Sequence, residues 1–136
     1  MPEYFIKEEI LSILEEVRIE YDLEERTLQF ALRVRNFIKK VQKTLTNIEY
    51  CRQLVRSSSS VGANYIEANE SFSKKDFYYR IKICRKESKE SKFFFRLIEI
   101  ENDNQLSIEQ TALIKESHEF VLIFSSILKK QDKEVT

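Results

Sequence analysis

The sequence predicts an all-α fold, an antiparallel up-down-up-down four-helix bundle, and three observations support this prediction. Apolar residues recur every three or four positions along four long segments. The linkers between these segments are short, about two to six residues, which favours antiparallel neighbours. One glycine and one proline in 136 residues leave little material for the turns of a β protein, and 34% charged residues suit a helical bundle.

Residues 1–21 precede the bundle, and their pattern predicts an additional short amphipathic helix. Between Tyr4 and Glu20 the apolar residues follow a period close to 3.6, with glutamates on the other face. We expect three parts in the chain: this N-terminal extension, a four-helix bundle over residues 22–131, and a disordered tail over residues 132–136.

Capping sequences indicate where the four bundle helices begin. They start at Asp22, Thr46, Ser73 and Ser107, and the helices that follow them are expected to end near residues 44, 69, 101 and 130.

The serine run Ser57–Ser60 lies inside the second bundle helix, because the apolar period continues through it. Small side chains there, together with Gly62, would let another helix approach closely, and the small residues Cys84, Ser88 and Ser91 indicate that this is the third helix. A phosphate-binding nest is the alternative, but no lysine follows the run as in a P-loop. The residues expected to pack between helices or subunits are Ser58, Gly62, Asn64, Tyr65, Glu67, Phe77 and Phe95.

No motif in the chain indicates catalysis, so we expect no enzyme activity, no cofactor, no metal and no small-molecule substrate. Cys51 and Cys84 are too few for a zinc site, and their distances from the turn between their helices differ by about 13 Å along the axis, which excludes a disulfide. Both are expected to be buried thiols. His118, the one histidine, is expected to be an ordinary, partly exposed residue.

Charge is unevenly distributed although the formal net charge is zero. Residues 1–23 contain two basic and seven acidic side chains, whereas residues 24–101 contain seventeen basic and ten acidic ones. No apolar run approaches the roughly 20 residues that span a bilayer, and the acidic start does not resemble a signal peptide. We therefore expect a cytoplasmic protein with no membrane contact.

A line of basic residues on the third helix is the candidate nucleic-acid-binding surface. Lysines at this spacing would follow a phosphate backbone, and a tyrosine would offer a stacking face. Two alternatives are open: a solvated face neutralised by Glu87 and Glu90, or a contact between subunits. The candidate residues are Lys75, Tyr79, Lys82, Arg85, Lys86, Lys89, Lys92 and Arg96.

The stretch from Ser57 to Ser91 resembles the central motif of a bacterial protein family encoded in intervening sequences of 23S ribosomal RNA genes, which is related to the accessory protein of diversity-generating retroelements. The similarity covers about Asp22 to Lys130. Its specific parts are residues 59–64, Glu67, residues 73–77, and the region of Lys86, Glu87 and Glu90. The resemblance implies an antiparallel four-helix bundle that forms a homo-oligomer, commonly a pentamer with a central channel. It implies no established enzyme activity.

Three hypotheses for function follow. The first is a non-enzymatic homo-oligomeric scaffold that serves RNA or a reverse transcriptase, since the retroelement branch is thought to bind both. The second is a nucleic-acid-binding module that uses the basic line. The third is the helical partner subunit of a nucleotidyltransferase-type enzyme. A steep salt dependence of RNA binding would favour the second.

Overall fold

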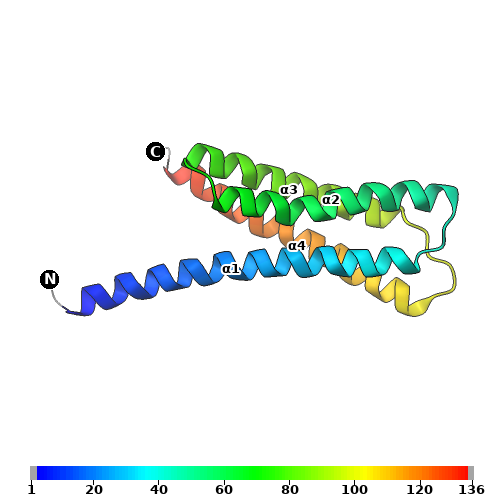
Figure 1. Ribbon diagram of the computed structural model, residues 1–136, viewed down its shortest axis with the longest axis horizontal. Coiled ribbons are helices and arrows are strands. Elements are labelled where there is room, and N and C mark those ends of the chain that lie inside the picture. Colours follow the sequence, from blue (N-terminus) through cyan, green and yellow to red (C-terminus); the bar gives the residue numbers. More distant parts are fainter. Residues whose placement is uncertain (1–2, 135–136) are drawn as a thin grey trace.

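The computed structural model describes residues 3–134, and the side chains of residues 7–18 and 22–133. This part of the chain folds into four helices and no strands: α1 (Glu3–Lys40), α2 (Leu45–Asn69), α3 (Lys74–Leu97) and α4 (Asn104–Glu134). The chain reverses at each of its three connections (Figure 1). Helices α1 and α3 both pack against α2 and α4; within the described residues the backbones of α1 and α3 do not approach each other, and their side chains meet in the core. The prediction of an all-helical four-helix bundle is confirmed.

Helix α1 is one continuous helix, so the prediction of a separate N-terminal helix is wrong. Neither glycine nor proline occurs between residues 3 and 40, and Asp22 is helical, so it does not cap a new helix. The first turns of α1 therefore project past the ends of the other helices (Figure 1).

Five other helix boundaries differ from the sequence prediction, and the first is the end of α1, which lies at Lys40 and not near residue 44. The N-cap of α2 is Thr44, two residues earlier than the expected Thr46. Its side chain accepts a hydrogen bond from the backbone amide of Asn47. Helix α3 ends at Leu97, not near residue 101, and Asp103 rather than Ser107 caps α4 by accepting from the Leu106 amide. Helix α4 continues to Glu134, so residues 132–134 are helical where a tail was expected; residues 135 and 136 lie outside the described part. The Ser73 cap of α3 is confirmed.

The core is aromatic and joins all four helices. The Phe30 ring of α1 lies 6.3 Å from Phe95 of α3 and 5.3 Å from Phe120 of α4, both edge to face. The ring of Tyr65 of α2 lies 6.0 Å from that of Phe124. Edge-to-face pairs of this kind add about 0.5–1.5 kcal/mol beyond burial, which stabilises one arrangement of the helices.

Two side-chain amides, that of the buried Asn47 and that of the half-buried Gln110, hold together the bundle end where α1 meets α2. Asn47 donates to the carbonyls of Gln42 and Glu99 and accepts from the Glu99 amide, so it joins both connections. The side-chain amide of Gln110 donates to the backbone carbonyls of Phe95 and Ile98, so these carbonyls at the end of α3 have hydrogen-bond partners. This explains why α3 ends early: its terminal carbonyls are bonded by α4.

Candidate nucleic-acid interface

Helices α2 and α3 form a close-packed hairpin, as the small residues predict. Ser91 donates to the Ser57 hydroxyl across the interface at 3.1 Å, and the Cys84 sulfur lies 3.5 Å from the Val61 carbonyl oxygen. Helix α2 continues through the serine run. Its hydroxyls donate to backbone carbonyls of the same helix; those of Ser59 and Ser60 donate to Val55 and Arg56 at 2.7 Å. Hydroxyls used in this way do not form a phosphate nest.

Gly62 makes its close contact with α1, which corrects the prediction that it lies in the α2–α3 interface. A Cβ atom at Gly62 would lie 2.9 Å from the Thr27 hydroxyl oxygen and 3.1 Å from the Thr27 Cβ. The small residues of α2 thus serve two neighbours, because they lie on two sides of the same helix.

The other predicted packing residues fall into three groups. Ser58, Tyr65 and Phe95 are buried, and Phe77 is half-buried against the core. Asn64 joins α2 to α3, because its Oδ1 accepts from Arg80 at 3.1 Å. Glu67 is exposed and is not part of the buried core.

The two glutamates expected to neutralise the basic line point away from it. Glu87 is buried and accepts from Arg56 of α2 at 3.2 Å, and Glu90 bonds to the same guanidinium. The hydrogen bond with Glu90 has the largest effect on the pKa of Arg56, and together these interactions raise it. One arginine of α2 therefore binds both carboxylates on the α2 side of α3.

The eight candidate residues of α3 lie on the surface. Arg85 and Lys92 are half-buried and the other six are exposed. Among the described residues, none of their charged groups lies within 4.0 Å of a carboxylate. The exposed phenylalanine Phe93 lies between Lys89 and Arg96 on the same side, one helical turn from each.

Helix α4 extends this surface, which sequence reasoning missed. The Lys92 ammonium lies 3.3 Å from Nδ1 of His118, so this side of α4 adjoins the basic line. Lys129 follows His118 by eleven residues, about three helical turns, and Lys115 precedes it by three. We define the basic face as Lys75, Lys82, Arg85, Lys86, Lys89, Lys92 and Arg96 of α3 with Lys115 and Lys129 of α4. The sequence does not show how α4 is aligned with α3, because that alignment is set by tertiary contacts such as the one between Lys92 and His118.

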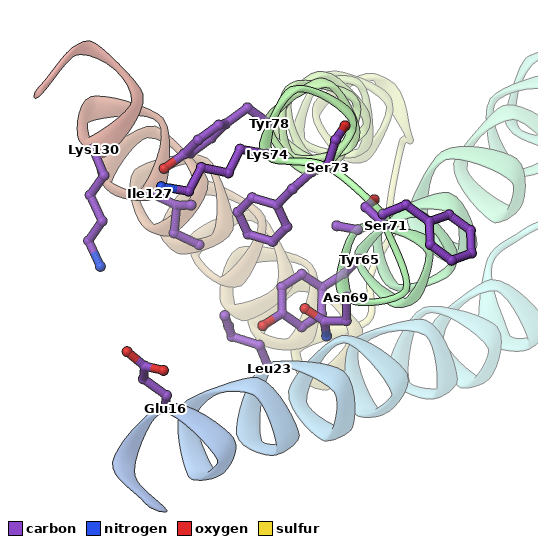
Figure 2. A pocket seen from close by; sticks show the side chains of 13 residues that line it. Glu16, Leu23, Tyr65, Asn69, Ser71, Ser73, Lys74, Tyr78, Ile127 and Lys130 are labelled. Atoms are coloured by element: carbon purple, nitrogen blue, oxygen red, sulfur yellow. The ribbon is translucent and has the colours of Figure 1, made fainter. Parts of the chain in front are cut away.

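A pocket of about 600 Å³ lies at the other end of the bundle, between α1, the α2–α3 turn and the end of α4. Its walls include Leu23, Tyr65, Phe77 and Ile127. Figure 2 shows Glu16 of α1 and Lys130 of α4 on opposite sides of the opening.

The described residues include no cluster of three metal-ligating side chains. Both cysteines are free and buried, as predicted, and burial raises the pKa of Cys84 to about 12. His118 is exposed. Over residues 3–134, no helix has a stretch long and apolar enough to cross a bilayer.

Comparison with known proteins identifies related sequences and folds. Residues 20–121 match the family model described as 23S rRNA-intervening sequence protein. A similar solved structure is that of a protein of unknown function from the S23 ribosomal protein family of Bacteroides thetaiotaomicron. It is 25% identical, has a TM-score of 0.66, and the match covers 79% of this chain and 98% of the other. No curated protein matches the sequence.

Proposed function

Because this chain belongs to the family of 23S rRNA-intervening sequence proteins, we propose that it is a non-enzymatic homo-oligomeric scaffold whose basic face binds RNA. The resemblance suggests a pentamer and, through the retroelement branch, a reverse transcriptase as a protein partner. This role places the protein in the cytoplasm.

The observation that supports RNA binding is the arrangement of Glu87 and Glu90. Both carboxylates bind Arg56 on the α2 side, so they do not offset the lysines of the basic face. Nine basic side chains from two adjacent helices then form one positive surface on a chain of zero net charge. A surface of this kind attracts the phosphate backbone, and the exposed rings of Tyr79 and Phe93 provide stacking faces for unpaired bases.

Assembly is supported by large apolar side chains on the surface of the single chain. Phe72 at the α2–α3 turn is fully exposed, and Leu45 and Ile108 are 82% and 70% exposed. Leu28 of α1 and Val55 and Ile66 of α2 are each about half exposed. Exposed apolar side chains mark a face that contacts another subunit where they form a contiguous patch.

The test is binding of a labelled single-stranded RNA at several salt concentrations. We expect the logarithm of the affinity to fall with the logarithm of salt by about 0.7 for each phosphate neutralised. The double variant Lys82→Glu, Lys86→Glu should bind at least about 10-fold more weakly at low salt. The matched control is Lys39→Glu, Lys40→Glu, which reverses two exposed lysines at the far end of α1.

Equal losses in both double variants would show that net charge, not this face, governs binding. No binding by the wild type at low salt would refute the RNA role. Light scattering that gives the monomer mass of 16.3 kDa at micromolar concentration would refute the scaffold.

A further inference from the structure

The first part of α1 has an apolar face that is left exposed by the described residues of the chain. We call residues 3–22 the N-terminal arm. It contains five large apolar side chains that are 51–64% exposed: Ile10, Leu11, Ile13, Leu14 and Val17. A single helix of about 20 residues is marginal in water unless its apolar side packs against something. The family match begins only at residue 20, so the arm adds to the family's bundle a segment that the match does not include.

Charge indicates which surface the arm would cover. The arm contains seven acidic and two basic residues, a net charge of −5. Glutamates border its apolar side: Glu9 and Glu16 lie one helical turn from Ile13, and Glu8 and Glu15 lie one turn from Leu11. All four are exposed.

The basic face is complementary to the arm in both charge and apolar content. Its lysines surround the exposed Tyr79 and Phe93 of α3, and Leu122 of α4 is 56% exposed one turn from His118. An acidic amphipathic helix would pair its glutamates with these lysines while it buries its apolar side on these three residues. The lengths also agree, since 20 residues of helix span about 30 Å and the line from Lys75 to Arg96 spans about 32 Å.

The arm cannot reach the basic face of its own chain. Helix α1 continues without glycine or proline from Glu3 to Lys40, and its contacts with α3 are made in the core by Phe30 and Phe37, far along the helix from the arm. Figure 1 shows the arm extending away from the bundle in line with the rest of α1. Contact with α3 therefore requires another molecule.

We propose that the N-terminal arm of one protomer docks on the basic face of a second copy of this chain, so that RNA and the arm compete for the same surface. The proposal deepens the proposed function and rests on it for the RNA role. The two surfaces differ, so the contact is heterologous, and a closed series of such contacts forms a ring.

Zero-length carbodiimide cross-linking tests the contact directly, because it joins carboxylates only to amines that touch them. Wild-type chains labelled with different isotopes are mixed, cross-linked and analysed by mass spectrometry. We expect links between chains from Glu8, Glu9, Glu15 or Glu16 to lysines of the basic face. A wild-type oligomer without any such link would overturn the proposal.

Charge reversal tests the competition. Changing Glu8, Glu9, Glu15 and Glu16 to lysine should lower the oligomer mass and strengthen RNA binding at least about 10-fold. The matched control changes the exposed Glu49, Glu70, Glu99 and Glu101 to lysine, which alters net charge equally and leaves the arm intact. Circular dichroism verifies that each variant is helical. The same mass and RNA affinity in both variants would contradict the proposal.

A compensating variant separates a specific contact from a general effect of charge. Lys75, Lys82, Lys86 and Lys89 changed to glutamate should lower the mass when the arm is acidic and restore it when the arm is basic. Failure to restore the mass counts against the proposal. Cross-links together with absent RNA binding in every variant would support the arm contact and refute the RNA role, so the two claims fail separately.

Discussion

Gly62 shows how much one residue depends on its neighbour across a helix interface. It is half-buried where α2 passes α1, and the space that a Cβ would need is occupied by Thr27. Thr27 is buried and its hydroxyl donates to the Glu24 carbonyl, so its side chain is held in place. The glycine is retained for close approach and not for a turn, since no glycine in the described chain has positive φ.

We expect Gly62→Ala to lower the free energy of unfolding by about 1 kcal/mol. Alanine is favoured over glycine in a helix by about 1 kcal/mol, but overpacking costs about 1–3 kcal/mol and outweighs this gain. Adding Thr27→Ala removes the clashing hydroxyl, so the double variant should be more stable than Gly62→Ala alone. Urea unfolding, monitored by circular dichroism, measures the free energy of unfolding of the wild type, both single variants and the double variant. If the Gly62→Ala variant is more stable than the wild type, the Thr27 side chain moves aside without a cost in free energy.

Helices α1 and α4 are joined by a charged cluster. Arg26 donates to both carboxylate oxygens of Glu116, at 2.9 and 2.6 Å, and also bonds to Glu119. Its guanidinium lies 5.1 Å from the centre of the Phe120 ring. Arg33 and Glu109 form a second pair at 3.1 Å. The hydrogen bonds from Arg26 lower the pKa of Glu116 below its usual 4.5.

Stability should therefore fall as the pH drops below about 4.5. Glu116 is ionised in the folded state at a pH where it is already protonated in the unfolded state, so its stabilising contribution is present above 4.5 and is lost as the pH falls through the lower folded pKa. Thermal unfolding between pH 3 and 6 measures this loss. Arg26→Gln should lower the melting temperature at pH 6 and flatten its dependence on pH.

The control is Arg35→Gln, which changes an exposed arginine of the same helix. This variant should keep the wild-type dependence on pH. If Arg26→Gln behaves in the same way, the cluster does not link α1 to α4 energetically.

At the scale of the whole molecule, zero net charge conceals two opposite surfaces. The N-terminal arm is acidic and projects from the bundle, and the basic face lies along α3 and α4. A contact between such surfaces is weakened by salt, because the screening length falls from about 10 Å at 0.1 M to about 3 Å at 1 M.

We therefore expect the oligomer mass to fall when sodium chloride is raised from about 50 mM to 500 mM, as measured by light scattering at constant protein concentration. The variant with lysine at positions 8, 9, 15 and 16 should show little further change. A mass that rises with salt would instead indicate assembly through apolar contacts such as Phe72 and Leu45.

Periodicity by itself determined much of this protein. It predicted the helical class, the continuity of α2 through the serine run, and the buried positions of Tyr65 and Phe95, and a capping sequence predicted the Ser73 cap. It also predicted the exposed line of lysines on α3. Spacing along a helix determines which side is buried, and it does so without knowledge of the neighbour.

Tertiary structure decided the rest, for the same physical reason. Periodicity does not say which helix faces a buried side, so Gly62 was assigned to α3 although Thr27 of α1 occupies the space beside it. Arg56 of α2 directs Glu87 and Glu90 away from the lysines, and contact between Lys92 and His118 adds α4 to the basic face. Local propensity did not reveal that α1 continues through Asp22. An N-capping sequence begins a new helix only where the chain turns, and the chain does not turn there.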